Sequence, residues 1–355
     1  MTEQNLLAAI TKLSHEFGTG DYVLGGGGNT SVKNETTLWV KPSGTTLGAL
    51  TPETFVAMSR AKLAELYEVQ APAESHAREA LVKTYMEKAV LPDSTGRASV
   101  EAPLHSTLNA RYVVHTHPTL VNGMTCAKDG KAACQTLFPE ALWLDFIDPG
   151  FTLCIKVRQE ILQYRQTHGY EPALIFLKNH GVFVAGDSPE AIQSLYAHIF
   201  ETLQAQYDKA GIVADVARGA CAAADSVSQS LRSDLGWGSD IHMAVSALFQ
   251  TPQGPISPDH IVYAKSYPLM GHPTQDAIQQ YNAQYGYDPA ILQTDQAVIA
   301  LGSSELRANL ALEMAIDGAQ VTQLAQAFGG LEYMTERARE FIENWEVESY
   351  RSKQL

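Results

Sequence analysis

Two histidines one residue apart, His115 and His117, end an apolar segment that begins at Tyr112. In a β-strand, residues i and i+2 lie on the same face, so both imidazoles are expected to point the same way. Pro118 follows at once and ends the strand, because proline lacks the N–H that a β-ladder needs. This spacing predicts two ligands of a metal site.

A catalytic zinc usually takes three protein ligands and keeps one position open, so a third ligand must come from elsewhere. The best candidate is His180, which follows the apolar segment 173–177 and precedes Gly181. This repeats the order of strand, imidazole and chain-turning residue. Glu101 lies just ahead of the helical stretch that leads into the histidine strand, where a carboxylate could bind metal or move protons.

The alternative interpretation is that these four residues are unrelated, because a single histidine beside an apolar segment is more often a hydrogen-bonded core residue. We adopt that interpretation for His105, His15 and His76. For His115, His117 and His180, the shared position at strand ends and the preference of zinc for imidazole favour a metal site.

The composition is that of an ordinary globular protein. Its 355 residues are 45% hydrophobic and 18% charged, which fits two domains better than one. The formal net charge of -14 argues against a nucleic-acid partner, and no apolar stretch is long enough to predict a membrane segment. Because the N-terminus lacks the pattern of a secretory signal and the four cysteines lack disulfide or CxxC spacing, we expect a cytoplasmic protein.

Two loops of small residues precede the histidine strand. They are the glycine-rich segment 25–33 and the segment 41–45, and they flank one short hairpin containing the predicted strand 37–40. Glycines let backbone N–H groups converge, and the neighbouring Asn, Ser and Thr side chains add neutral donors that suit a phosphate. The spacing matches neither a P-loop nor a dinucleotide fingerprint, so a flexible surface hairpin stays as an alternative, although Ser43 and Gly44 favour phosphate.

The remaining patterns up to about residue 210 predict helices around short strands. The predicted helices are 6–17, 152–165 and 189–210, with a helix-rich stretch over 52–88 and a strand at 141–144. We therefore expect a mixed α/β domain in which strands carry the ligands and helices lie outside.

After about Gly211 the sequence changes character, and small-residue and polar stretches predict a boundary. We expect a catalytic domain over residues 1–215 and a smaller C-terminal α/β domain of unknown role over residues 216–355. Ser304 is interpreted as a helix cap rather than an anion site, because no Gly-x-Gly-x-x-Gly pattern is present. The predicted strands of this domain are 260–263 and 297–301, and its predicted helices are 304–328 and 335–350.

Taken in order, the motifs resemble those of the class II aldolase/adducin family. They are Gly28-Asn29-Thr30-Ser31-Val32-Lys33, Lys41-Pro42-Ser43-Gly44, Glu101 with His105, His115-Thr116-His117-Pro118 and Lys178-Asn179-His180-Gly181. The resemblance covers residues 1–215 and implies an α/β/α sandwich around a mainly antiparallel central sheet, usually in a homotetramer.

The resemblance also implies the roles of the site residues. His115, His117 and His180 would hold Zn²⁺, with Mn²⁺ or Co²⁺ as alternatives, and Glu101 would be the acid/base. A phosphate pocket would be lined by Gly28, Asn29, Ser43, Gly44 and Ser99. Val100 departs from the small polar residue sometimes found at its position, which leaves that phosphate contact without support.

The implied activity is a zinc-dependent retro-aldol cleavage of a sugar phosphate. Breaking the bond leaves an enediolate whose charge a Lewis acid stabilises, and Glu101 would return the proton. Epimerases of the family typically carry aspartate in place of Glu101, which favours an aldolase here. Decarboxylases of 3-oxo sugar-acid phosphates keep the glutamate and are the nearest alternative. Non-catalytic adducin-like members, which serve as structural proteins, have lost the metal histidines.

The C-terminal part is similar to the segment that follows the aldolase domain in bifunctional rhamnulose-1-phosphate aldolase/lactaldehyde dehydrogenases. The similarity rests on segment 259–263 and on segment 343–348. Those proteins carry a further short-chain dehydrogenase domain, so the chain is similar to their aldolase half. This similarity predicts cleavage of rhamnulose 1-phosphate, or of another deoxyketose 1-phosphate, to dihydroxyacetone phosphate and an aldehyde.

Overall fold

The computed structural model describes residues 2–345 apart from 71, 73–74, 217–223 and 239, and it divides into two compact units. Unit 1 comprises the residues up to Val121 and those from Lys131 to Leu203. Unit 2 comprises Asn122–Gly130 and the residues from Gln204 onwards. The division at 203/204 precedes the domain boundary that we predicted at residue 215, and that boundary stays a prediction.

Unit 1 is built on a seven-stranded sheet with the strand order β3-β2-β1-β4-β7-β6-β5. All neighbouring strands are antiparallel except β5 and β6, which run parallel. This confirms the predicted α/β class with a mainly antiparallel sheet. The strands are β1 Asn29–Lys33, β2 Thr37–Val40, β3 Val56–Ser59, β4 Tyr112–Thr116, β5 Leu142–Leu144, β6 Leu174–Leu177 and β7 Gly181–Gly186.

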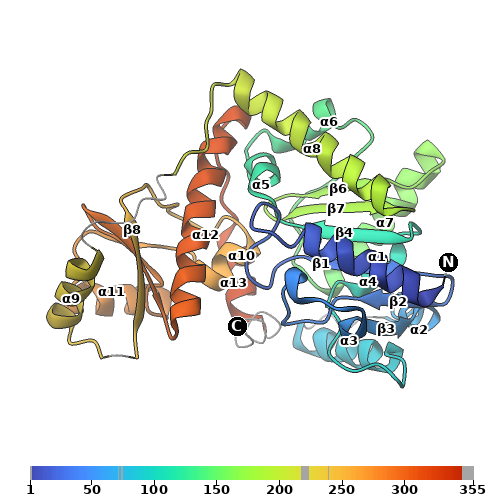
Figure 1. Cartoon of the computed structure of the whole chain (residues 1–355), viewed down its shortest axis with the longest axis horizontal. Helices are drawn as coiled ribbons and strands as arrows, with labels where there is room; N and C mark the ends of the chain where they lie inside the picture. Colours follow the sequence, from blue (N-terminus) through green and yellow to red (C-terminus); the bar gives the residue numbers. More distant parts are fainter. Residues whose placement is uncertain (1, 71, 73–74, 217–223, 239, 346–355) are drawn as a thin grey trace. The chain divides into compact units, whose positions relative to one another are not determined.

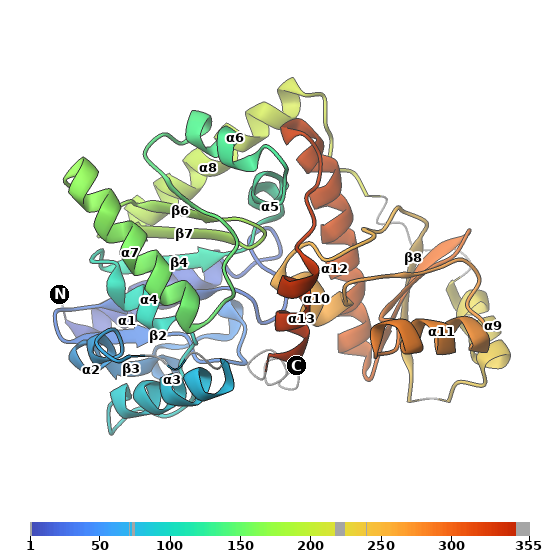
Figure 2. The same ribbon diagram turned by 180° about the vertical axis from the view of Figure 1, so that it is seen from behind.

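Helices cover both faces of this sheet. Helices α1 and α8 lie over one face (Figure 1), and α4 and α7 lie over the other (Figure 2). The helices of this part are α1 Glu3–Glu16, α2 Arg60–Glu65, α3 Ser75–Ala89, α4 Ala102–Thr107, α5 Thr119–Thr125, α6 Gly130–Leu137, α7 Phe151–His168 and α8 Pro189–Lys209, and two short 3-10 helices are η1 Leu47–Ala49 and η2 Pro52–Thr54.

Strand β4 is buried along its length because both of its faces are covered by helices. Tyr112, Val113 and Val114 have no exposed surface. Val113 packs in the cluster formed with α4 and α7, while Thr116 contacts Tyr196 of α8 through their hydroxyl groups, 2.7 Å apart. Because side chains alternate along a strand, His115 shares the face of Val113 and is directed towards α4.

One prediction of secondary structure was incomplete and one was wrong. Within the helix-rich stretch 52–88, the segment Val56–Ser59 is strand β3, at one edge of the sheet. In a strand of only four residues, the alternation of apolar and polar residues is too short to be distinguished from a helical pattern. The segment 260–263, predicted as a strand, belongs to helix α10, Pro258–Ala264. Ser257 at the N-cap, Pro258 at the first position and Asp259 in the first turn outweigh the β-branched residues.

Unit 2 contains a four-stranded sheet with the order β8-β11-β10-β9, which confirms a second, smaller α/β part. Helices α9 and α11 pack on one face of this sheet. Ser304 caps α12 by accepting a hydrogen bond from the main-chain N–H of Arg307, as predicted. Its elements are α9 Ala224–Leu235, β8 His242–Ala247, α10, β9 Leu269–Met270, α11 Gln275–Tyr285, β10 Ile291–Gln293, β11 Ala297–Gly302, α12 Glu305–Leu324, η3 Ala325–Phe328 and α13 Glu336–Asn344.

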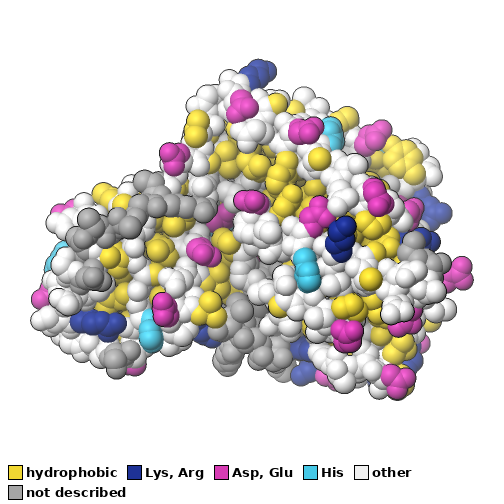
Figure 3. All heavy atoms as spheres, in the orientation of Figure 1, with side chains coloured by type: hydrophobic (Ala, Val, Ile, Leu, Met, Phe, Trp, Pro, Cys, Tyr) yellow, Lys and Arg dark blue, Asp and Glu magenta, His cyan; other side chains and the backbone are white. Residues whose placement is uncertain are grey.

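Acidic side chains, which outnumber basic ones in the sequence, lie on the surface of the protein (Figure 3). Acidic side chains are scattered among polar and apolar ones over the described part of the face in Figure 3. No helix among the described residues is both long and apolar enough to cross a membrane. The thiols of Cys126, Cys134 and Cys154 are buried and form no disulfide among the described residues, and Cys221 lies outside those residues.

A basic side chain, that of Lys33, lies inside unit 1. Lys33, the last residue of β1, is 2% exposed, and its amino group donates hydrogen bonds to the main-chain oxygens of Leu108 (2.9 Å) and Ala110 (2.6 Å). Burial, together with the nearby Arg60 guanidinium, lowers the pKa of Lys33 to about 7, although two neighbouring carboxylates oppose this shift. The ammonium form is therefore disfavoured in the folded protein.

We expect Lys33 to make the free energy of unfolding rise with pH above about 7. Its pKa lies below its ordinary value of 10.5, so in this interval the unfolded chain binds more protons than the folded one. Each pH unit then favours the folded state by up to about 1.4 kcal/mol. Urea unfolding of the wild type and Lys33→Met at several pH values from 7 to 9 isolates this contribution as a difference. If the free energy of unfolding rose equally steeply with pH in the two proteins, the prediction would be contradicted.

Candidate active site

The predicted site residues meet at one end of the seven-stranded sheet. Strands β1, β4 and β7 are neighbours, and their register pairs Asn29 with His115 and Thr116 with Val182. The start of β1, the end of β4 and the start of β7 therefore lie together. His117 comes directly after β4, and His180 comes directly before β7.

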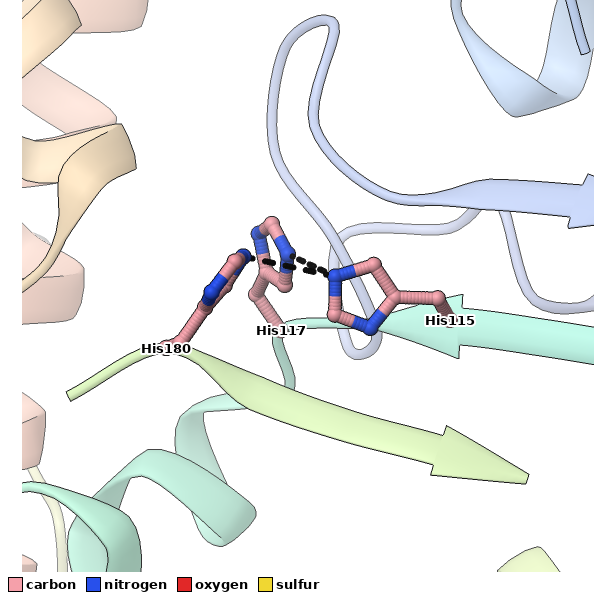
Figure 4. A group of neighbouring side chains, drawn as sticks. All are labelled: His115, His117 and His180. Atoms are coloured by element: carbon pink, nitrogen blue, oxygen red, sulfur yellow. Dashed lines mark hydrogen bonds between the residues drawn. The ribbon is translucent and has the colours of Figure 1, made fainter. Parts of the chain in front are cut away.

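The three histidines form one cluster. The Nε2 atom of His115 lies 3.0 Å from Nε2 of His117 and 3.4 Å from Nε2 of His180. One ring nitrogen from each histidine falls within 4.8 Å of the other two, a group that could hold a metal ion. Figure 4 shows the three rings turned towards one another from the ends of β4 and β7.

The surroundings of His115 fix which nitrogen can bind a metal. Its Nδ1 lies 2.9 Å from the main-chain oxygen of Val182, which can only accept, so Nδ1 carries the hydrogen and Nε2 carries the lone pair. The ring is 1% exposed and stacks on Phe183, with 3.8 Å between centroids. A hydrogen bond of this kind orients a metal-binding histidine and raises its basicity.

Gly181 is required where β4 and β7 approach each other. A Cβ atom at this position would lie 2.4 Å from the main-chain oxygen of Thr116 and 2.7 Å from Cδ2 of His117. The left-handed residue of the turn is Asn179, with φ 53. We predicted Gly181 as the chain-turning residue, but its role is to leave room for the imidazole of His117.

Glu101 lies beside this cluster as the N-cap residue of α4 and is 6% exposed. Its Oε2 atom accepts a hydrogen bond from Nδ2 of Asn29 (2.6 Å) and lies 3.7 Å from Nε2 of His115. Its Oε1 atom is buried and has no hydrogen-bond partner among the described residues. A buried carboxylate oxygen without a partner is costly, which indicates a place for a bound group.

The three loops of the predicted phosphate pocket adjoin one another through main-chain hydrogen bonds. The N–H of Lys41 donates to the oxygen of Thr30 (3.0 Å), and the N–H of Ser99 donates to the oxygen of Lys41 (3.1 Å). The N–H of Ser43 donates to the oxygen of Arg97 (2.7 Å). The segment from Lys41 to Ser43 thus lies between β1 and the loop that leads to Glu101.

Gly28 and Gly44 have the positive φ angles that glycine favours, 62 and 83. A Cβ at Gly28 would lie 2.7 Å from the main-chain oxygen of His115, so the glycine-rich loop packs directly against the end of β4. Asn29 differs from our expectation of a side chain open to phosphate, because its amide is bonded to Glu101 and to His105. The phosphate roles of Gly28, Asn29, Ser43, Gly44 and Ser99 stay predictions.

His105 is the site neighbour whose role the sequence did not reveal. As predicted for a core histidine, it is fully buried and hydrogen-bonded, to Asn29 through Nε2 and to Ser31 through Nδ1 (2.7 Å). Burial, followed by the charges of Lys33 and His115, holds the pKa of His105 well below its usual range. The only signal in the sequence is its position four residues after Glu101, one turn along a helix.

A profile of the Class II Aldolase and Adducin N-terminal domain family matches residues 8–207. The chain belongs to this family. The match covers unit 1 from residue 8 onwards and every residue of the site, and it confirms the resemblance on which the expected fold was based.

Similar proteins span parts of this chain. The uncharacterized oxidoreductase YuxG of Bacillus subtilis (strain 168) is 26% identical over 176 residues, which cover 46% of this chain and 24% of YuxG. The chain thus matches about a quarter of the length of that relative.

Two solved structures illustrate the structural neighbours. The N-terminal class II aldolase domain of a conserved protein from Thermoplasma acidophilum is 23% identical, with a TM-score of 0.48, covering 56% of this chain and 91% of that one. The L-fuculose-1-phosphate aldolase of Thermus thermophilus is 19% identical, with a TM-score of 0.38, covering 59% of this chain and 97% of that one.

We expect His115→Ala to abolish stable metal binding. Removing one of three imidazoles that share a metal leaves two, so the affinity for Zn²⁺ should fall by at least about 100-fold. Metal content after dialysis and titration with Zn²⁺ measure the change. His15→Ala, which removes an imidazole bonded to the main-chain oxygen of Leu50, is the matched control. Unchanged metal content in His115→Ala would show that the cluster is not a metal site.

Gly181→Ala should weaken the same metal affinity without removing any ligand. The added methyl group would overlap the ring of His117 and the oxygen of Thr116, so the imidazole or the strand must shift. We expect a decrease of about 10-fold or more in affinity for Zn²⁺. Gly20→Ala, where the nearest atom to an added Cβ is Cδ2 of Leu24 at 3.8 Å, controls for the loss of a glycine. A Gly181→Ala protein with wild-type affinity would refute this account of the glycine.

Proposed function

We propose that the chain is a metal-dependent aldolase that cleaves a ketose 1-phosphate to dihydroxyacetone phosphate and an aldehyde. The observation that carries this proposal is that three imidazoles converge beside a buried carboxylate oxygen that has no partner among the described residues. Membership of the class II aldolase and adducin family supports it.

His115, His117 and His180 are the residues that would hold the metal, and their donor set suits Zn²⁺, with Mn²⁺ or Co²⁺ as alternatives. When bound, the ion supplies a Lewis acid for a substrate oxygen that gains negative charge. The protein contributes the surroundings: His115 and Glu101 are 1% and 6% exposed, which limits the contact of these two side chains with water.

Glu101 is proposed as the acid/base, with Oε1 as the working atom. Oε2 is held by Asn29, so the proton is exchanged at Oε1. When the C3–C4 bond of the sugar breaks, its electron pair stays with C3, the C4 hydroxyl releases its proton to solvent water, and C4 becomes the carbonyl carbon of the aldehyde. Solvent water in turn supplies the proton that Glu101 carries, so no net proton is gained or lost. Glu101 then delivers a proton to C3, which completes dihydroxyacetone phosphate.

The phosphate is proposed to bind at the loops containing Gly28, Ser43, Gly44 and Ser99. Their main chains adjoin one another at the same end of the sheet as Glu101, and neutral N–H and hydroxyl donors suit a phosphate. For Asn29, the proposed contact is through its main-chain N–H, because its side chain is bonded to protein groups.

The substrate proposed first is rhamnulose 1-phosphate or another deoxyketose 1-phosphate. This choice rests on the similarity of segments 259–263 and 343–348 to the bifunctional aldolases described above, and residues 346–348 lie outside the described residues. The homo-oligomer, tetrameric in the family, and the cytoplasmic location stay predictions of the sequence. YuxG carries the name of an oxidoreductase, and that activity is not part of the proposal.

Glu101→Gln should lower kcat by about 10²- to 10⁴-fold and leave metal content unchanged, because the amide cannot exchange the proton. A coupled reductase assay of dihydroxyacetone phosphate measures the rate, and Glu53→Gln, at an exposed carboxylate, is the control. Mass spectrometry of products from a library of sugar phosphates and sugar-acid phosphates tests the reaction class. A metal-replete wild type inactive on ketose 1-phosphates would refute the aldolase, and carbon dioxide release would favour a decarboxylase.

A further inference from the structure

One face of β1 carries a row of buried polar side chains. Asn29, Ser31 and Lys33 alternate along the strand, so they share a face, and they are 6%, 0% and 2% exposed. Their partners come from α4 and the residues that follow it: His105 for the first two, and main-chain oxygens for Lys33. The row therefore fixes α4, which begins directly after Glu101, against β1.

The hydrogen bonds of this row have a direction that follows from the groups themselves. The amide nitrogen of Asn29 can only donate, and it donates to Oε2 of Glu101 (2.6 Å), so the amide oxygen is the group that accepts. The group that donates to this oxygen is Nε2–H of His105.

The tautomer of His105 follows in the same way. The ring has no exposed surface and its two nitrogens contact Asn29 and Ser31, neither of which is acidic, so the imidazole is neutral. With its hydrogen on Nε2, Nδ1 must accept, and the hydroxyl of Ser31 donates to it (2.7 Å). One continuous sequence of donors thus runs from Ser31 through His105 and Asn29 to Glu101.

We propose that His105 and Ser31 are positioning residues for Glu101. They hold the amide of Asn29 in the one orientation that donates to Oε2, so that Oε1 is presented to the substrate. The inference rests on the proposed function for its effect on rate, but the hydrogen-bond sequence itself is independent of which reaction is catalysed. It assigns a function to a histidine that acts only through the side chain of Asn29.

The opposite face of β1 provides a matched control. Thr30 points away from the row and contacts Ser14, with 2.6 Å between their hydroxyl oxygens, and both side chains are fully buried. Ser14→Ala therefore removes a buried hydroxyl that bonds to the same strand but is not part of the sequence of donors ending at Glu101. A merely structural role for Ser31 would make Ser14→Ala and Ser31→Ala alike.

The first experiment compares kinetics. We expect His105→Leu and Ser31→Ala to lower kcat by about 10- to 100-fold with KM and metal content unchanged. His105→Gln, whose amide N–H can replace Nε2–H, should recover most of the rate. On a Glu101→Gln background, His105→Leu should cause little further loss, because its effect passes through Glu101. An equal loss on both backgrounds, or an equal loss from Ser14→Ala, would overturn the proposal.

The second experiment does not need activity. In protein labelled with ¹⁵N-histidine, the proposal expects neutral His105 with the hydrogen on Nε2, and an altered tautomer signal in Ser31→Ala. An imidazolium, or hydrogen on Nδ1, would overturn it. A wild type without aldolase activity but with the expected tautomer refutes the proposed reaction and leaves the hydrogen-bond sequence standing, so the two failures are distinguishable.

Discussion

The structure depends on the close approach of β4 and β7 at their ends. Neighbouring strands lie about 4.8 Å apart, so the side chains of residues just beyond two paired strand ends can contact each other. Here that geometry brings His117 and His180 together, with His115 inside the paired part of β4. Only glycine fits at residue 181, because any larger residue would meet the opposing main chain. The convergence of imidazoles is thus a consequence of strand pairing.

Burying so many polar groups requires that each has a partner, since an unpaired one costs roughly 1–3 kcal/mol. The row on β1 meets this requirement by combining side chains with main-chain oxygens at the end of α4. Burying the charged form of Lys33 remains unfavourable, and this lowers its pKa to about 7. Oε1 of Glu101 is left without a partner among the described residues, at the place where a substrate would supply one.

The sequence predicted what depends on local periodicity and left open what depends on pairing between distant segments. His115 and His117 could be predicted because period two puts them on one face, and Ser304 because capping is local. The partners of Asn29 could not, since Glu101 and His105 lie more than 70 residues away in sequence and only the sheet register brings them near. The β-propensity of the β-branched residues also gave a wrong prediction at α10, where the residues at the helix N-terminus outweigh it.

The arrangement of the histidines bears on the choice between an enzyme and a non-catalytic member of the family. Nε2 atoms 3.0 Å and 3.4 Å apart place nitrogen lone pairs against one another unless a proton or a cation lies between them. The hydrogen on Nδ1 of His115 is directed to Val182, so its Nε2 is an acceptor, and a cation can satisfy all three rings at once. The three imidazoles could hold a metal ion, and the buried carboxylate lies beside them, which are the two kinds of group that a metal-dependent lyase uses.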